Sequence, residues 1–127
     1  MEDVGATAEG VIKSLLNKDN KLDLTTGQIR KFLTAVNSLT SKIEVCKAQN
    51  EKLVELPPNF VMEIKYLKVK IAYQAGRDKT KSVKNFVEKA KLFERIDKIG
   101  NSFTEYENFA RYIEALVAYH KFYGGKD

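Results

Sequence analysis

The stretch Asn59–Arg77, NFVMEIKYLKVKIAYQAGR, decides the fold class. It follows Pro57-Pro58 and holds no further proline, and proline is tolerated in the first turn of a helix but not in its interior. On a helix its apolar side chains form two stripes, Ile64/Leu67/Ile71 and Met62/Tyr66/Val69/Tyr73, with lysines between them. The spacing predicts a helix over about 59–75, capped by Gly76, that packs against two neighbours.

Similar apolar spacing predicts the other helices. Thr25 and Gln28 have the spacing of a capping box, so a helix begins there and extends to about Gln49. A further stripe from Val83 to Ile96 is closed by Gly100, and the last helix covers about 104–123 with two apolar faces. With a short helical piece at about 8–16, we predict an all-α fold, a compact bundle of about four main helices plus a short N-terminal helix. Apolar side chains left exposed on the last helix would favour self-association.

The composition indicates a cytoplasmic protein of one domain. The chain has 127 residues, 43% of them hydrophobic, enough for a core without disulfides. Its single cysteine, Cys46, belongs to no metal-binding motif. The first ten residues lack the basic start and apolar run of a signal peptide, and no run approaches the length of a membrane span.

The net charge of +5 comes from the middle of the chain. Residues 60–95 hold 10 Lys/Arg and 4 Asp/Glu, whereas 1–59 hold 8 of each and 96–127 hold 4 and 5. A local basic excess of this kind is typical of a surface that binds a phosphate-rich partner, although acidic proteins and anionic membranes also attract it.

The sequence contains no recognisable motif for catalysis or for binding a metal or a cofactor. It contains no phosphate-binding glycine loop, no nucleophile elbow and no paired acidic cluster. His120 is the single histidine, which excludes two-histidine zinc sites, and a Cys46/His120 pair lacks a supporting motif. We interpret His120 as a capping or packing residue, and Arg111 as a partner of Glu107 and Glu114 along one helix.

The basic residues gather around one predicted helix–loop–helix corner and are offset there by Asp78 and Glu88: Lys65, Lys68, Lys70, Arg77, Lys79, Lys81, Lys84, Lys89 and Lys91. If they share a face, they can neutralise backbone phosphates; otherwise they form an ordinary solvated surface. Tyr66 and Tyr73 could stack on bases nearby, but their helical spacing favours a place in the core.

Three segments resemble the small subunit of type III-A CRISPR effector complexes, the Csm complex. They are LTTGQIRKFL (24–33), EIKYLKVKIAYQAGR (63–77) and FARYIEALVAYHK (109–121), the last followed by Gly124-Gly125. The similarity spans Leu24 to the C-terminus, which divides the chain into a variable N-terminal segment, 1–23, and a helical bundle domain, 24–127.

The resemblance implies a non-catalytic protein that lines up in several copies along target RNA and CRISPR guide RNA, contacting other Csm subunits in antiviral defence. Its RNA-facing candidates here are Lys65, Lys68, Lys70 and Arg77, then Arg111, His120 and Lys121, with Lys79, Lys81 and Lys84 added by their place at the corner. A subunit that accepts any target should touch backbone rather than base edges. The alternative is a helical scaffold whose basic face contacts acidic protein partners, with incidental RNA contact.

Overall fold

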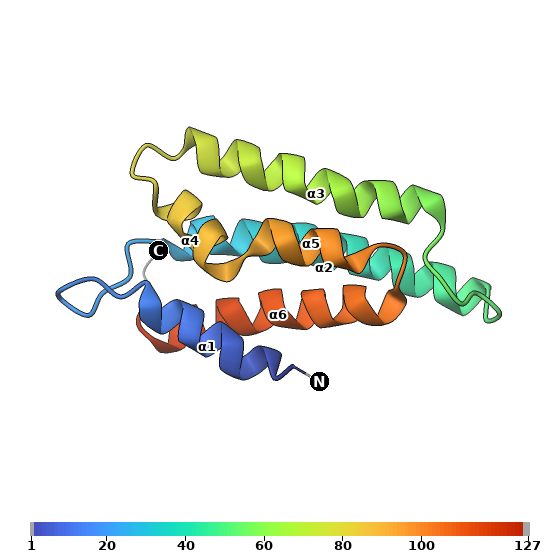
Figure 1. Cartoon of the computed structure of the whole chain (residues 1–127), viewed down its shortest axis with the longest axis horizontal. Coiled ribbons are helices and arrows are strands. Elements are labelled where there is room, and N and C mark those ends of the chain that lie inside the picture. Colours follow the sequence, from blue (N-terminus) through green and yellow to red (C-terminus); the bar gives the residue numbers. More distant parts are fainter. Residues whose placement is uncertain (1, 126–127) are drawn as a thin grey trace.

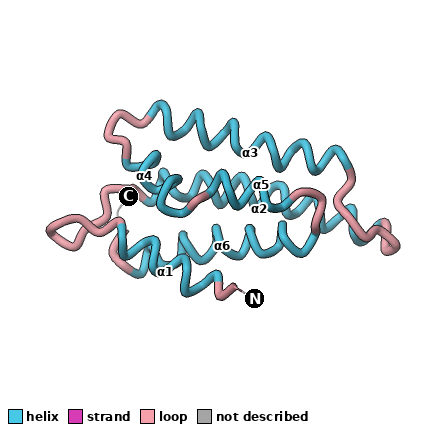
Figure 2. Tube along the Cα trace, in the orientation of Figure 1, coloured by secondary structure: helices cyan, strands magenta, loops and turns pink. Residues whose placement is uncertain are grey.

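The computed structural model describes residues 2–125 and arranges them in six helices (Figures 1 and 2). They are α1 (Val4–Ser14), α2 (Thr26–Gln49), α3 (Pro58–Arg77), α4 (Ser82–Ala90), α5 (Leu92–Ile99) and α6 (Phe103–Phe122). The extended structure within 2–125 amounts to one isolated bridge between Leu16 and Leu22. The all-α prediction is therefore confirmed.

The predicted capping box starts α2. The Thr25 hydroxyl accepts the backbone N–H of Gln28 at 3.1 Å, and the Gln28 side-chain oxygen accepts the N–H of Thr25 at 2.9 Å. These two bonds satisfy backbone donors that an uncapped helix end leaves open. The helix then continues without a break to Gln49.

The end of α3 differs from the prediction, because Gly76 lies inside the helix and Asp78 follows its last residue. The carboxylate of Asp78 accepts the backbone N–H of Val83 at 2.9 Å and the Thr80 hydroxyl at 2.8 Å. One aspartate thus turns the chain from α3 into α4, and its backbone bond to Val83 lowers the pKa of the Asp78 carboxyl.

The predicted third main helix is in fact two helices, α4 and α5, separated at Lys91. Lys91 has φ = 55°, in the left-handed region, which interrupts the helical phase. In one continuous helix, Leu92, Ile96 and Ile99 would face away from the α4 stripe of Val83, Phe86, Val87 and Ala90. All seven are buried, so the break rotates α5 until its own apolar side chains reach the same core.

Helix α6 packs against α1, α2 and α5. In Figure 1, α3 lies along the opposite side of α2 and α5 from α6. Two buried tyrosines of α6 join these layers: the Tyr106 hydroxyl donates to Val36 O at 3.1 Å, and the Tyr112 hydroxyl donates to Ala90 O at 2.9 Å.

The prediction that α3 packs through two stripes is wrong. Phe60, Ile64, Leu67 and Ile71 are buried, while the second stripe, Met62/Tyr66/Val69/Tyr73, is exposed. The two apolar faces predicted for α6 are confirmed, since Tyr106 and Tyr112 are both buried, but Phe122 is the one large apolar side chain of α6 that is left strongly exposed. Four of the eight exposed large apolar residues of the described chain therefore lie together on α3.

The N-terminal segment contributes to the core. Ala8 and Ile12 of α1 are fully buried, and α1 packs against α6 and α4. At the start of the segment, the Glu2 carboxylate accepts two hydrogen bonds from the Arg95 guanidinium on α5. The same guanidinium lies 3.8 Å from the centre of the Tyr112 ring. The division at residue 24 stays a prediction, and residues 126–127 of the second segment lie outside the described residues.

Candidate nucleic-acid interface

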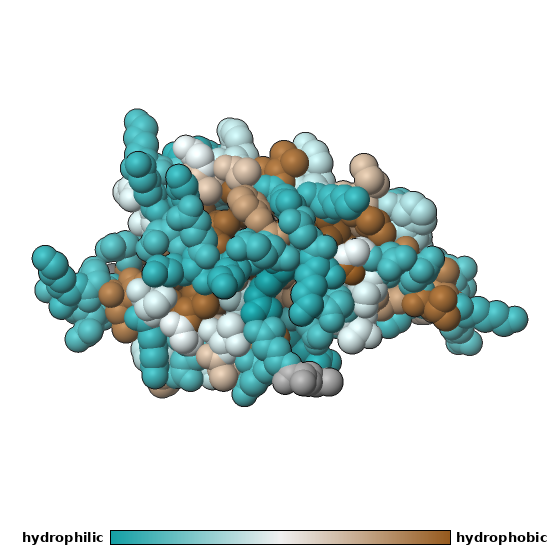
Figure 3. All heavy atoms as spheres, viewed as in Figure 1, coloured by the Kyte–Doolittle hydropathy of each residue, from teal (hydrophilic) through white to brown (hydrophobic). Residues whose placement is uncertain are grey.

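The predicted basic corner is formed by the last turns of α3, the loop 78–81 and the first turns of α4. Figure 3 shows long hydrophilic side chains projecting over this end of α3. Six of the ten predicted RNA-binding side chains are exposed on α3 or at this corner: Lys65, Lys70, Arg77, Lys79, Lys81 and Lys84. None of the six takes part in an ion pair with the described residues.

Lys68 belongs to the same helix but faces another element. It is half-buried, its ammonium lies 2.8 Å from the Asp97 carboxylate of α5, and it lies 5.8 Å from the centre of the Phe93 ring. Lys68 therefore joins α3 to α5. Among the described residues, the cations of α3 that remain free to bind a partner are Lys65, Lys70 and Arg77.

The two acidic residues at the corner, Asp78 and Glu88, offset only part of its positive charge, and neither forms an ion pair with a described cation. Asp78 directs its oxygens to the backbone and hydroxyl groups that start α4. Glu88 is exposed and forms no ion pair with a described residue. The corner is therefore a region of positive potential that can attract a polyanion.

Arg111 and Lys121 are exposed on α6, outside the basic corner. Arg111 lines a groove between α2 and α6 together with Glu44 and Glu114. The predicted pairing of Arg111 with Glu107 and Glu114 does not form within 2–125; Glu107 instead pairs with Lys47 of α2 at 3.3 Å. The structure does not bring these two cations together with the cations of α3.

His120 is a packing residue, and the prediction that it faces RNA is wrong. The side chain is 1% exposed, and its Nε2 donates to Leu24 O at 2.6 Å, just before α2 begins. The backbone N–H of Gly125 donates to His120 O at 2.8 Å, which folds the chain end over the ring. A buried imidazole committed to a carbonyl cannot reach a surface ligand.

Tyr66 and Tyr73 are exposed, at 57% and 69%, so the prediction that they lie in the core is wrong. Their spacing is helical, but it follows the outward face of α3. The signal that could have placed them outside is the neighbouring stripe, since Ile64/Leu67/Ile71 is wholly aliphatic and supplies a sufficient core face.

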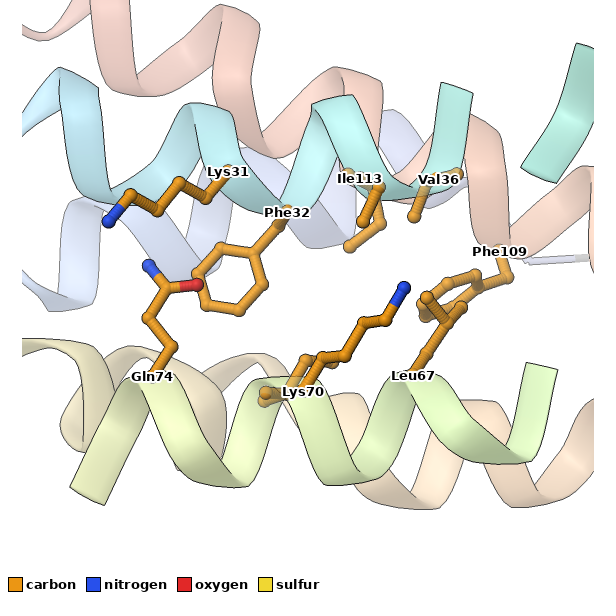
Figure 4. Close-up of a pocket in the computed structure, with 10 residues that line it drawn as sticks. Lys31, Phe32, Val36, Leu67, Lys70, Gln74, Phe109 and Ile113 are labelled. Carbon is orange, nitrogen blue, oxygen red and sulfur yellow. The ribbon is translucent and has the colours of Figure 1, made fainter. Parts of the chain in front are cut away.

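The interface between α2 and α3 is incompletely filled. Figure 4 shows Phe32 and Val36 of α2 facing Leu67 of α3 around a small apolar cavity, of about 40 Å³, with Lys70 reaching from α3 towards α2. Next to it, an open groove of about 560 Å³ is lined by Tyr66 and Met62 on one side and Thr34 and Ser38 on the other.

The remaining chemistry of the chain is sparse. Cys46 lies near the end of α2, whereas His120 bonds to Leu24 before its start, a separation of about 30 Å at about 1.5 Å per residue. A Cys46/His120 catalytic pair is therefore excluded. Within 2–125, no three His, Cys, Asp or Glu side chains are placed to hold a metal ion. No helix among these residues is long and apolar enough to cross a membrane.

The fold and the surface define the class of the protein: it is a small helical protein with unpaired cations around one corner. The family described as Csm2 Type III-A matches residues 1–126. The chain belongs to this family, a component of type III-A CRISPR systems.

Relatives from three organisms support the same assignment. The CRISPR system Cms protein Csm2 of Streptococcus thermophilus is 45% identical over 116 residues, which cover 90% of this chain and 86% of that protein. The protein of the same name from Mycobacterium tuberculosis is 40% identical, with 92% and 89% covered. The one from Enterococcus italicus is 34% identical, with 79% and 68% covered.

Proposed function

We propose that the chain is the non-catalytic small subunit of a type III-A CRISPR RNA-guided complex, binding the backbone of target RNA and guide RNA. In that role it would work in the cytoplasm and contact other Csm subunits and copies of itself. The observation that carries the proposal is the group of exposed, unpaired cations on α3 and at the corner: Lys65, Lys70, Arg77, Lys79, Lys81 and Lys84.

Backbone binding suits this arrangement better than reading of base edges. The cations are long and flexible, and they lie on a convex helix and an exposed loop rather than on an element shaped to enter a groove. Ammonium groups neutralise phosphates without regard to sequence, so a subunit of this kind leaves sequence recognition to base pairing. Few contacts per copy imply weak binding by one chain and stronger binding by several copies in an assembly.

The proposal is tested in the reconstituted complex with the double variant Lys65→Ala/Lys70→Ala. Both side chains are exposed and unpaired, so the fold should be unaffected. The matched control is Lys18→Ala/Lys52→Ala, which removes the same charge from two other exposed, unpaired lysines, one in the loop before α2 and one in the loop after it. Target-RNA affinity is measured at several salt concentrations.

The α3 variant should bind target RNA more weakly and with a shallower salt dependence, by about 0.7–0.9 in log–log slope for each phosphate that is no longer neutralised. The control should match the native complex. Equal affinity for all three complexes would contradict RNA contact by α3. Equal affinity together with loss of a neighbouring subunit on purification would support the scaffold alternative, in which the basic face meets an acidic protein.

A further inference from the structure

The outward face of α3 carries an apolar stripe that no described part of the chain covers. Met62, Tyr66, Val69 and Tyr73 are 65%, 57%, 52% and 69% exposed. At about 100° per residue, this stripe lies opposite the buried stripe of Phe60, Ile64, Leu67 and Ile71. Figure 3 shows apolar side chains along this outer edge of α3, between hydrophilic ones.

The two tyrosines are in line on this face. They lie seven residues apart, which is two helical turns and about 10.5 Å along the axis. Tyr66 borders the open groove between α2 and α3, and Tyr73 has the Arg77 guanidinium 5.7 Å from its ring centre. Each ring therefore has an accessible face with polar or cationic groups beside it.

Cations flank the stripe on both sides. Lys65 lies on one side, and Lys70 and Arg77 lie on the other, by their helical positions. The acidic residue on this surface, Glu63, is paired with Lys42 of α2 at 3.7 Å. The stripe is thus a row of aromatic and apolar groups with one cation that is unpaired within 2–125, Lys65, on one side and two, Lys70 and Arg77, on the other.

This pattern complements single-stranded RNA. Aromatic groups stack on bases whatever their sequence, while lysine and arginine beside them neutralise phosphates. A protein-docking face also has an apolar core and a polar rim, so the feature that favours RNA is the group of unpaired cations beside both tyrosines, which can neutralise phosphates.

We propose that Tyr66 and Tyr73 stack on unpaired bases of an RNA strand whose phosphates contact Lys65, Lys70 and Arg77. This inference rests on the proposed function and deepens it, because it assigns α3 a contact to bases in addition to the backbone. The contact is tolerant of sequence, since every base has a stacking face. A base stacked on Tyr66 would lie beside the hydroxyl groups of Thr34 and Ser38, which line the same groove.

The test uses the isolated full-length chain and fluorescence anisotropy at low salt. The probes are an oligouridylate of about 16 nucleotides and a matched abasic strand of ribose phosphate. The variants are Tyr66→Ala/Tyr73→Ala and the conservative Tyr66→Phe/Tyr73→Phe. Because both tyrosines are exposed, all variants should fold, and circular dichroism with sedimentation checks this and the state of association.

The native chain and the phenylalanine variant should bind oligouridylate more tightly than the abasic strand. The alanine variant should lose at least about fivefold in affinity for oligouridylate per tyrosine and bind both strands equally. The abasic strand should bind all three chains alike, through the cations.

Three results would overturn the inference. The first is an unchanged preference for bases in the alanine variant. The second is a changed sedimentation coefficient with unchanged RNA affinity, which would assign the stripe to protein contact. The third is no binding by the native chain at concentrations above about 0.1 mM, where non-specific binding is normally seen. Each leaves the proposed function standing if the Lys65→Ala/Lys70→Ala complex still loses RNA affinity.

Discussion

Lys91 holds a conformation that lysine disfavours, with φ = 55° between α4 and α5. The left-handed region costs a side chain with a Cβ about 1–2 kcal/mol, whereas glycine adopts it freely. Lys91→Gly should therefore raise the free energy of unfolding by about 0.5–1 kcal/mol, after the extra entropy of an unfolded glycine is subtracted. Urea denaturation measures this change.

The control for that substitution is Lys89→Gly, which removes the same charge within the last turn of α4. There the backbone is helical, so glycine should lower the free energy of unfolding by about 0.5–1 kcal/mol. If both substitutions destabilised the protein equally, Lys91 would not be strained.

The ion pair between Glu2 and Arg95 makes the free energy of unfolding depend on pH. The hydrogen bonds from Arg95 lower the pKa of the Glu2 carboxyl below its ordinary value in the folded protein. A lowered folded pKa means that the stabilisation is present above the unfolded pKa and is lost as the pH falls through the folded value. The Glu2 side chain is 42% exposed, so we expect less than about 1 kcal/mol.

Glu2→Gln should therefore lower the unfolding free energy at pH 7, and this difference should shrink as the pH falls through the lowered pKa of the Glu2 carboxyl, in thermal or urea unfolding. Glu88→Gln is the control, because Glu88 is exposed and outside the ion pairs of the described residues. A difference for Glu2→Gln that did not shrink as the pH fell would mean that the charge is not the cause.

At the scale of the element, α3 is a helix with one structural face and one free face. Ile71→Ala should cost about 2–5 kcal/mol of unfolding free energy, because it leaves a cavity beneath the helix. Val69→Ala, on the free face, should change it by less than about 0.5 kcal/mol. Comparable losses in chemical denaturation would show that the outer stripe is packed in the isolated protein.

The helices themselves were predictable from local chemistry, as the Thr25/Gln28 capping box shows. Spacing alone could not tell which stripe of α3 is buried, because that depends on how many neighbours the helix has in space. The break at Lys91 was also hidden. No glycine or proline marks it, and it shows only as a change of phase between Ala90 and Leu92.

For the candidate site, the charge pattern predicted the corner but failed for two residues, His120 and Lys68. The exposed lysines of α3 and α4 were placed correctly on the surface, because unpaired ammonium groups are rarely buried. His120 is buried and its Nε2 donates a hydrogen bond to Leu24 O, a contact between residues 96 positions apart. Lys68 faces α5 because Asp97 lies there, which local sequence does not encode.

At the scale of the whole molecule, α1 is part of the single core. Deleting residues 2–23 should lower the unfolding free energy by more than about 3 kcal/mol, since Ile12 and Ala8 are fully buried and α6 would lose its cover. Urea unfolding of the shortened chain tests this. A transition with the native midpoint and slope would support an independent domain beginning at residue 24.

The chain end folded over His120 has a consequence for how such sequences diverge. A Cβ added at Gly125 would overlap the imidazole, so glycine is required there as long as histidine fills position 120. The two positions should therefore change as a pair over evolutionary time. A relative with alanine at the place of Gly125 should carry a smaller side chain at the place of His120, and each change made alone should be purged by selection.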